Sequence, residues 1–340
     1  MPRAVIADAY GPPDSYRLEQ RDPGPPGPGQ ARVAVRAAGV SFVDVLTAAG
    51  GYQVKPPLPF IPGSECAGVV EAVGADIVGL KVGDRIQASG WGGIFAEAVN
   101  LPERTVRRIP DALSFEVAAV LGVSYATAWY ALVQRGRLAA GETLLVLGAG
   151  GATGYAAVQV GKHLGARVIA SASSEAKRAL ALAGGADAAV DATSPTWRDD
   201  LKAANGGKPI DVVFDPIGGA ATEPAFRALG WNGRHLVIGF TGGLTQIKTN
   251  HALIKGASLI GVDIRQFGIY EPNLAAANMA EVFALAGAGV LNPAIAKTYP
   301  LESFADAMRE AAEGKSAGRV VITMGSRIEN AAHTGVESTY

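Results

Sequence analysis

The stretch that most constrains the fold of this 340-residue chain runs from Thr143 to Leu164 and reads TLLVLGAGGATGYAAVQVGKHL. A short apolar run, a cluster of glycines and apolar residues at helical spacing predict a strand, a tight turn and a helix. Glycines let the backbone approach an anion closely, and the start of a helix offers free N–H groups and a partial positive charge. The stretch therefore predicts a pyrophosphate-binding turn made by Gly148, Gly150, Gly151, Ala152, Thr153 and Gly154.

The glycine spacing in this turn departs from the usual dinucleotide fingerprint, G-x-G-x-x-G. Counted from Gly148, the sixth position is Thr153, and the glycine follows one residue later at Gly154. Glycine instead recurs at every third residue, 148, 151 and 154. A glycine-rich turn of an α/β protein that binds no dinucleotide is the plainer alternative.

Strands and helices alternate after residue 143. This alternation predicts right-handed βαβ crossovers and a parallel sheet with helices on both faces, and a ligand would bind at the carboxyl ends of its strands. The expected strands are 144–147, 167–170, 188–190, 211–214, 234–238 and 258–262. After the helix that follows the glycine turn, the expected helices are 175–183, 197–203 and 223–229.

The regions before and after this alternating part show a different sequence pattern. Short alternating stretches punctuated by Gly and Pro predict strands over 4–9, 31–37, 67–73 and 105–109, and residues 82–86 predict a turn that enters a further strand. Helical patterns cover 114–121, 125–134, 274–286 and 303–313, and an apolar strand is expected over 319–323. Residues 325–340 show no periodicity, and we assign them no function.

Composition and charge exclude several classes of protein. Hydrophobic residues make up 49% and charged residues 18%, too little charge for a disordered chain, and the length favours two domains. The net charge of −1 gives no basic footprint, so we expect neither specific nucleic-acid binding nor a membrane partner. Two uncharged runs, 117–133 and 143–161, approach spanning length, but their Ser, Thr, Tyr and Gly content favours buried elements. The first residues lack the apolar segment of a signal peptide, so the cytoplasm is the expected location.

The end of the second expected strand of the alternating part bears on the choice of cofactor. A dinucleotide fold that prefers NADH usually carries Asp or Glu there, to bind the ribose 2′-hydroxyl. Here no carboxylate occurs before Glu175, and Ser173, Ser174 and Lys177 supply hydroxyls and a cation. Such groups suit a 2′-phosphate, so the sequence predicts NADPH. The alternative is that the cations only form a solvated helix face.

Six short motifs occur in order: AAGVSFVD from residue 37, PFIPGSECAGVV from 59, VGDR from 82, GAGGATG from 148, VFDPIGG from 213 and VIGF from 237. Together they resemble the medium-chain dehydrogenase/reductase superfamily, and within it the zinc-free, zeta-crystallin-like quinone oxidoreductase branch. The resemblance covers residues 1–324 and implies an α/β fold with two domains. A GroES-like β-rich catalytic domain, 1–123 and 266–324, would be split around a Rossmann domain with a doubly wound parallel sheet, 124–265, which leaves 325–340 as a C-terminal tail. A homodimer joined at edge strands of the Rossmann domain is also implied.

Two positions separate this chain from the zinc-dependent relatives. Those relatives carry Cys where this chain has Ser41 and His where it has Ser64, and a serine hydroxyl is a poor zinc ligand. Their structural zinc lobe needs four clustered cysteines, whereas this chain has one, Cys66, which we interpret as a small buried residue. The four histidines show no ligand spacing. We therefore expect no metal.

The missing zinc ligands also bear on the substrate. Without a Lewis acid an alkoxide is hard to stabilise, whereas hydride addition to a quinone or a conjugated carbonyl gives a delocalised anion. The sequence thus predicts an NADPH-dependent reductase of quinones or α,β-unsaturated carbonyl compounds. A reductase of enoyl thioesters or 2-haloacrylates is one alternative. An NADPH-binding structural or RNA-associating protein with little catalysis is an alternative of another class.

The resemblance implies further site residues. Tyr52 would face the nicotinamide and donate a proton, although a loop tyrosine packed against prolines is the plainer interpretation. Ser41 would lie near the nicotinamide ribose, and Asp44 would either bond the substrate region or act as a structural cap. The remaining expected cofactor contacts are Thr127, Gly239, Phe240, Val262 and Arg319, the last on the 2′-phosphate side or in the domain cleft.

Overall fold

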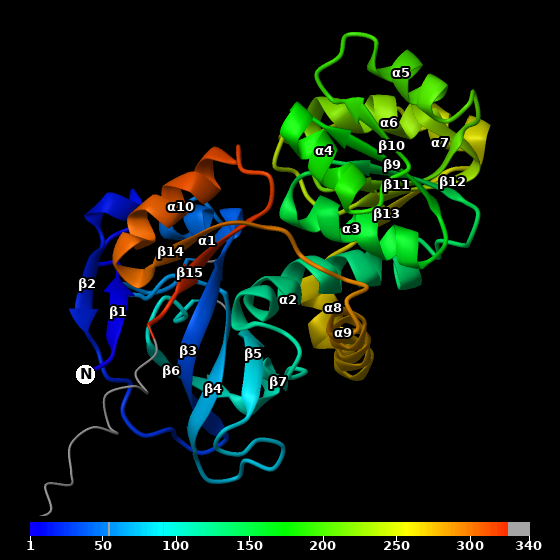
Figure 1. The fold of residues 1–340 in the computed structure, drawn as a ribbon. Coiled ribbons are helices and arrows are strands. Elements are labelled where there is room, and N and C mark those ends of the chain that lie inside the picture. Colours follow the sequence, from blue (N-terminus) through cyan, green and yellow to red (C-terminus); the bar gives the residue numbers. More distant parts are fainter. Residues whose placement is uncertain (54, 91, 326–340) are drawn as a thin grey trace, which may run out of the picture.

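The computed structural model describes residues 1–53, 55–90 and 92–325. Two large sheets form separate parts of the molecule, and helix α2 (Phe115–Trp129) lies between them (Figure 1). On one side α2 packs against α3 (Ala152–His163), and on the other against strands of the second sheet. Of the expected tail, 325–340, all but Gly325 lies outside the described residues.

The first sheet has six strands, and every neighbouring pair is parallel. The strand order is β10-β9-β8-β11-β12-β13, so the chain leaves β8 toward one edge, returns to β11 and then proceeds to the other edge. This reversal between β8 and β11 makes the sheet doubly wound, and such sheets bind ligands outside the carboxyl ends of the strands at the reversal. The expected Rossmann-type sheet is confirmed. Its strands are β8 (Thr143–Leu147), β9 (Arg167–Ala172), β10 (Ala188–Asp191), β11 (Ile210–Asp215), β12 (Leu229–Val237) and β13 (Ser258–Gly261).

Helices cover both faces of this parallel sheet. One face shares a buried cluster with α2 and α3, and the other carries a separate cluster built around residues such as Ile169, Val213 and Phe226. This two-sided burial explains why the central strands β8, β9 and β11 are nearly continuous apolar runs. Besides α3, the helices are α4 (Glu175–Ala183), α5 (Trp197–Ala204), α6 (Thr222–Ala228) and α7 (Asn250–Lys255).

The second large sheet joins the two ends of the described chain. Its order is β14-β15-β3-β4-β5-β7, with β6 paired to β3 beside this path. The late strand β15 runs antiparallel to β3, so a segment after residue 318 completes a sheet begun before residue 41. The sheet is therefore split around the parallel one, as a GroES-like catalytic part requires. Its strands are β3 (Gln30–Val40), β4 (Glu65–Val73), β5 (Arg85–Ser89), β6 (Ala98–Pro102), β7 (Val106–Arg108), β14 (Ile295–Pro300) and β15 (Arg319–Thr323).

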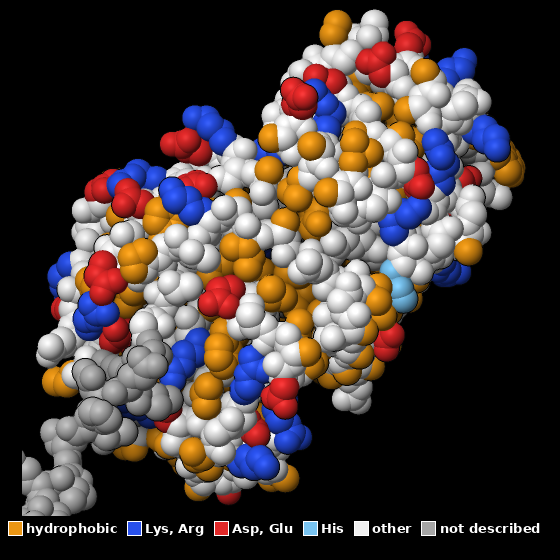
Figure 2. All heavy atoms as spheres, viewed as in Figure 1, with side chains coloured by type: hydrophobic (Ala, Val, Ile, Leu, Met, Phe, Trp, Pro, Cys, Tyr) orange, Lys and Arg blue, Asp and Glu red, His pale blue; other side chains and the backbone are white. Residues whose placement is uncertain are grey.

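Smaller elements complete this β-rich part. The hairpin of β1 (Arg3–Ile6) and β2 (Arg17–Gln20) pairs antiparallel. Helices α1 (Phe42–Ala48) and α10 (Phe304–Glu313) contact each other, and both supply side chains to the core of this part. On the face shown in Figure 2, cations and carboxylates are interspersed rather than gathered into one basic surface.

The two helices expected over 114–121 and 125–134 are a single helical segment, so that expectation is wrong. Helix α2 continues into a π-helical turn, Tyr130–Arg135. Gly122 does not end the helix but allows close approach, because a Cβ there would lie 2.4 Å from Gln87 Nε2. The predicted domain limit between residues 123 and 124 falls inside this helix. Helices α8 (Ile264–Tyr270) and α9 (Pro272–Gly287) pack against α2 as well.

By length and composition the segment Phe115–Arg135 could cross a membrane. However, 72% of its most apolar window is buried inside the protein. The segment thus has the properties of the core helix of a globular protein, which passes the same test of length and composition.

Candidate functional site

The glycine turn lies at the carboxyl end of β8, where the strand order reverses. Gly148 follows β8 with φ of 60°, a left-handed conformation that favours glycine. A Cβ on Gly154 would lie 2.3 Å from the carbonyl oxygen of Gly148, and one on Gly150 would lie 2.4 Å from Cβ of Lys177. The backbone conformation therefore favours glycine at Gly148, and close contacts require glycine at Gly150 and Gly154.

Helix α3 starts directly after this turn and includes Ala152, Thr153 and Gly154. Its N-cap is Gly151, which has no side chain to bond the first backbone N–H groups of the helix. A 12-residue helix also carries a partial positive charge at this end. The arrangement fits a pyrophosphate, whose oxygens would accept from these N–H groups.

The hydroxyls expected to bind a 2′-phosphate lie at the carboxyl end of β9, the strand next to β8. Ser173 and Ser174 are exposed, and Ser174 Oγ caps α4 by accepting from the backbone N–H of Lys177 at 3.4 Å. The neighbouring Ser171 is buried, and its Oγ accepts from Trp197 Nε1 at 2.9 Å. The structure thus leaves Ser173 and Ser174 at the surface of this strand end.

Lys177 connects the two large parts of the protein. Its stem lies against Gly150 in the glycine turn, and its ammonium donates to the backbone carbonyl of Gly314. Gly314 follows α10, which belongs to the β-rich part. The structure therefore brings Lys177 beside the glycine turn, and it adds a contact between the two parts that sequence reasoning missed. No pattern in the sequence signals a bond to a backbone carbonyl 137 residues away.

The carboxylate at the end of β10 is balanced by a cation. Asp191 Oδ2 lies 3.0 Å from Arg178 Nη1. Hydrogen bonds from Thr193, together with this guanidinium, hold the pKa of Asp191 below its usual value. Arg178 therefore pairs with Asp191. Of these two neighbouring cations on α4, Lys177 is the one that can bind a phosphate.

The side chain of Arg319 is buried beside a carboxylate. Its side chain is 7% exposed and forms an ion pair with Glu65, with 3.1 Å between Nη2 and Oε1. Its Nη1 also donates to Ser124 Oγ at 3.0 Å, and Glu65 Oε2 accepts from the backbone N–H of Val123 at 2.8 Å. The guanidinium therefore ties β15 to β4 and α2. Of the two expected places for Arg319, the 2′-phosphate side and the domain cleft, neither is tested directly, but a buried carboxylate already pairs with its charge.

Ser41, Ser64 and Asp44 form one hydrogen-bonded cluster. Ser41 caps α1, and Asp44 Oδ2 accepts from its backbone N–H at 2.8 Å and its hydroxyl at 2.7 Å. The side chain of Ser64 also bonds Asp44. Burial raises the pKa of Asp44, and these hydrogen bonds offset part of that shift. Of the two interpretations of Asp44, the structure supports the cap.

A cavity of about 20 Å³ lies beside this cluster and is lined in part by Asp44, Ser64 and Thr47. The two serines stand where zinc-dependent relatives have Cys and His, and both are bonded to a carboxylate here. Within the described residues, no group of three or more His, Cys, Asp or Glu side chains is placed to hold a metal ion. Burial raises the pKa of Cys66 to about 12, so its thiolate form is strongly disfavoured.

Tyr52 lies in the loop after α1 and is half-buried. Tyr10 fastens this loop, since its hydroxyl donates to the backbone carbonyl of Pro56 and its ring contacts Gly50. Gly50 itself has φ of 74°, which favours glycine. The loop that carries Tyr52 is thus held at both of its ends.

The remaining expected contacts lie on α2 and at the far strand ends of the parallel sheet. Thr127 is buried, and its Oγ1 donates to the carbonyl of Val123 at 2.7 Å. Val262 is buried after β13, and its backbone N–H donates to Val237 at 2.9 Å. Gly239 and Phe240 follow β12, with the Phe240 side chain 55% exposed. The structure thus places Gly239, Phe240 and Val262 at the carboxyl ends of adjacent strands.

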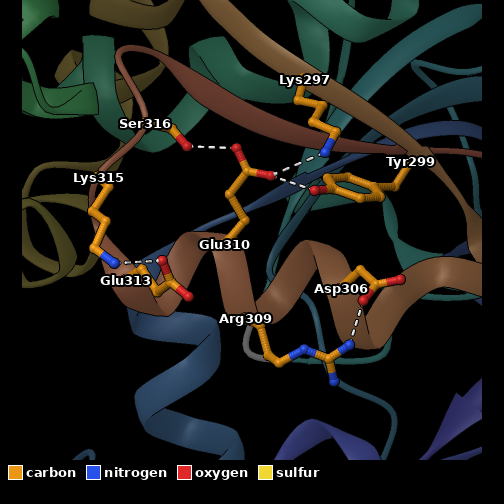
Figure 3. Close-up of a pocket in the computed structure, with 8 residues that line it drawn as sticks. All are labelled: Lys297, Tyr299, Asp306, Arg309, Glu310, Glu313, Lys315 and Ser316. Atoms are coloured by element: carbon orange, nitrogen blue, oxygen red, sulfur yellow. Dashed lines mark hydrogen bonds and ion pairs between the residues drawn. The ribbon is translucent and has the colours of Figure 1, made fainter.

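A cavity of about 520 Å³ lies elsewhere, at α10 and β14 (Figure 3). Its charged side chains pair with one another, as Lys315 does with Glu313 at 3.0 Å and Lys297 with Glu310 at 3.6 Å. None of the expected site residues lines it, so we place the functional site at the carboxyl ends of β8, β9 and β11 instead. The lining residues are Lys297, Tyr299, Asp306, Arg309, Glu310, Glu313, Lys315 and Ser316.

A split β-rich sheet joined to a Rossmann-type sheet with a glycine turn defines a two-part nucleotide-binding protein. Two protein families match the corresponding segments, Alcohol dehydrogenase GroES-like domain over residues 27–111 and Zinc-binding dehydrogenase over residues 152–281. The chain is 35% identical to Quinone oxidoreductase-like protein 2 of Rattus norvegicus over 90% of its length and 88% of that protein. It is 32% identical to Quinone oxidoreductase of Pongo abelii, over 95% of this chain and 98% of that one.

Solved structures agree with these relatives. A mycobacterial protein solved in complex with NADPH superposes with a TM-score of 0.85 at 27% identity, covering 95% of this chain and 100% of that one. The chain belongs to the medium-chain dehydrogenase/reductase superfamily, in its zinc-free quinone oxidoreductase branch, and is an oxidoreductase with a nicotinamide cofactor. The expected family and fold are therefore confirmed.

Proposed function

We propose that this protein is an NADPH-dependent, zinc-independent reductase of quinones or α,β-unsaturated carbonyl compounds. The observation that carries the choice of NADPH is the carboxyl end of β9. It offers two exposed hydroxyls, Ser173 and Ser174, and no carboxylate before Glu175, and Lys177 lies beside the glycine turn. A carboxylate at this place would repel a 2′-phosphate, whereas hydroxyls and an ammonium stabilise it.

The chain's own groups divide the binding of the cofactor between two strand ends. The N-terminus of α3 holds the pyrophosphate, and Ser173, Ser174 and Lys177 hold the 2′-phosphate. Lys177 exchanges the Gly314 carbonyl for the phosphate when the cofactor binds, because a charge-assisted bond is the stronger one. Backbone groups at Gly239 and Phe240 orient the nicotinamide, which when bound supplies the hydride.

The acceptor follows from the groups available on the β-rich side. Serine hydroxyls at positions 41 and 64 are poor metal ligands and are bonded to Asp44, so they polarise a carbonyl weakly. A quinone or enone needs less polarisation than a simple ketone, because the negative charge formed on its reduction is delocalised. Tyr52 supplies the proton to the reduced oxygen or carbon, since a phenol is a competent hydrogen-bond donor.

The decisive experiment measures NADPH oxidation against benzoquinones, naphthoquinones, enones, enals, acryloyl thioesters and 2-haloacrylates. NADH replaces NADPH in one control, and exhaustive chelation precedes the assay in another. Turnover of quinones or enones with NADPH that survives chelation is the expected result. Equal affinity for NADH would refute the cofactor choice, and stoichiometric zinc would refute the metal-free reaction. Tight NADPH binding without turnover of any acceptor would favour a non-catalytic role.

The protein also offers a surface for a second copy of itself, and we propose a homodimer. Strand β13 is the edge of the parallel sheet, so its outer backbone groups are available for pairing. Large apolar side chains are exposed on β13 and on the neighbouring segments: Trp231 at 74%, Leu253 at 82%, Ile254 at 69% and Leu259 at 54%. Exposed apolar side chains next to an unpaired edge are a feature of association surfaces.

A further inference from the structure

A short turn follows β11 at the edge of the sheet where the strand order reverses. Strand β11 ends at Asp215 and lies next to β8, which ends just before the glycine turn. The turn 216–219 then leads into α6 through two glycines with φ of 71° and 56°. Since ligands of doubly wound sheets bind at this reversal, the position of this turn bears on the cofactor.

Contacts show that the turn supports both neighbouring cofactor segments. Ile217 packs so closely on the glycine turn that a Cβ on Gly148 would lie 2.6 Å from its Cδ1. A Cβ on Gly218 would lie 3.0 Å from Cα of Phe240, and the N–H of Gly219 donates to the carbonyl of Gly243 at 2.8 Å. A displacement of this turn would therefore also displace the glycine turn, which would bind the pyrophosphate, and the segment after β12, which would contact the nicotinamide.

The carboxylate of Asp215, which is 1% exposed, holds this turn in place through hydrogen bonds to its backbone. Its Oδ1 accepts from the backbone N–H groups of Ile217 at 2.9 Å and Gly218 at 2.8 Å. Its Oδ2 accepts from Thr222 Oγ1 at 2.7 Å and lies 3.0 Å from His235 Nε2. Burial would raise the pKa of Asp215, but the bonds from His235, Gly218 and Thr222 outweigh it and keep the pKa below the usual value. Asp215 is thus ionised, and its ionised form is stabilised by the groups that donate hydrogen bonds to it.

His235, on β12, is fully buried beside this carboxylate. Because an ionised carboxylate only accepts hydrogen bonds, Nε2 of His235 is the donor. The other ring nitrogen, Nδ1, is buried and has no hydrogen-bond partner among the residues that the structure describes. The ring lies 5.8 Å from that of Phe226, in an apolar layer. An apolar side chain would fill the same space without burying an unpaired ring nitrogen. The advantage of a histidine here is therefore the hydrogen bond from its Nε2 to Asp215.

We propose that His235 is a positioning residue: by donating to Asp215 it fixes the turn 216–219, and through this turn it sets the affinity for the nicotinamide cofactor. The inference rests on the nicotinamide binding in the proposed function. Loss of the donor leaves Oδ2 with Thr222 alone, so the carboxylate can rotate. Rotation loosens its bonds to Ile217 and Gly218 and frees the two segments that the turn supports.

The experiment compares His235→Leu, which removes the donor but fills the space, with His235→Gln, whose amide can donate to Asp215. NADPH dissociation constants, steady-state kcat and KM, melting temperature and amide hydrogen exchange of Ile217 and Gly218 are measured for each. We expect His235→Leu to weaken NADPH binding about tenfold or more, as loss of a hydrogen bond to a charged group would. Its two turn amides should exchange faster, and His235→Gln should restore both properties. Phe226→Leu, which changes the same layer without touching Asp215, is the matched control.

A structural role without positioning would give a different result. A lower melting temperature with an unchanged NADPH dissociation constant would overturn the proposal, and so would an affinity loss that His235→Gln fails to restore. If His235→Leu does not fold, Thr222→Val removes the other side-chain donor to Oδ2, and unchanged affinity in that variant overturns the proposal as well. The wild-type protein separates the proposed activity from the positioning role of His235. NADPH binding without reduction of any acceptor would refute the activity, while the effect of His235→Leu on NADPH affinity could still be measured. A wild type that binds no nicotinamide nucleotide defeats both.

Discussion

At the scale of single residues, the contacts of Lys177 bear most directly on cofactor binding. Its stem contacts the glycine turn, and its ammonium is bonded to a backbone carbonyl rather than to a carboxylate. A neutral carbonyl holds the ammonium less strongly than a phosphate dianion, so the cation is available to the cofactor. The same bond also links the residue after α10 to α4.

We predict that Lys177→Ala weakens NADPH binding about tenfold to a hundredfold, because a charge-assisted hydrogen bond contributes about 1.5–3 kcal/mol. NADH binding should stay unchanged, since NADH has no 2′-phosphate. Lys162→Ala is the control, because Lys162 pairs with Asp187 at 2.8 Å. Isothermal titration with both nucleotides checks the difference, and equal weakening for NADH would contradict the assignment.

A second prediction concerns Tyr52. Tyr52→Phe should lower kcat about a hundredfold, in the range of general acid catalysis, while the NADPH dissociation constant is retained. Tyr10→Phe is the control for a loosened loop, since it removes only the hydroxyl bond to Pro56. Stopped-flow measurement of NADPH oxidation separates the two variants. If Tyr52→Phe turns over at the wild-type rate, Tyr52 is not the proton donor.

At the scale of elements, the strands of the parallel sheet were predictable because each is a short apolar run between turn residues. All six occur where expected, although β12 starts five residues earlier, at Leu229 instead of 234. The strands that sequence reasoning missed, β2, β6 and β14, are short or lie at exposed places, as RLEQ in β2 illustrates. Their pairing partners, rather than their own residues, make them strands. Helix α2 was wrongly divided into two helices, and the close approach that Gly122 allows within it depends on neighbours in space that the sequence does not show.

The role of Gly122 gives a third prediction. Gly122→Ala would place a methyl group 2.4 Å from Gln87 Nε2 and 2.9 Å from Glu65 Oε2, so it should destabilise the protein by about 1–3 kcal/mol. Gly268→Ala in α8 is the matched control, because nothing lies within 4 Å of its Cβ position. There the gain in helix propensity should leave stability unchanged or raise it by up to about 1 kcal/mol. Urea unfolding of both variants measures the difference, and equal effects would contradict the close-packing role of Gly122.

At the scale of the whole molecule, the proposed dimer surface at β13 makes the fourth prediction. Leu259→Lys places a charge on the unpaired edge strand and should shift the protein from dimer to monomer, because a charge on an edge strand opposes pairing. Val78→Lys, at a side chain that is 93% exposed on the β-rich part, is the control. Sedimentation velocity at several concentrations measures the shift. A wild type that sediments as a monomer throughout would exclude the dimer.

The sequence by itself determined the glycine turn, the alternation of strands and helices, and the missing carboxylate after β9. Each of these depends on backbone conformation or composition within a few neighbouring residues, and such local constraints are readable without a partner. The tertiary structure decided which charges are free. Arg319 looked available for a phosphate but pairs with Glu65, 254 positions away in the chain. Asp215 gains His235 and Lys177 gains Gly314 in the same way, because packing, rather than spacing along the chain, brings these groups within bonding distance.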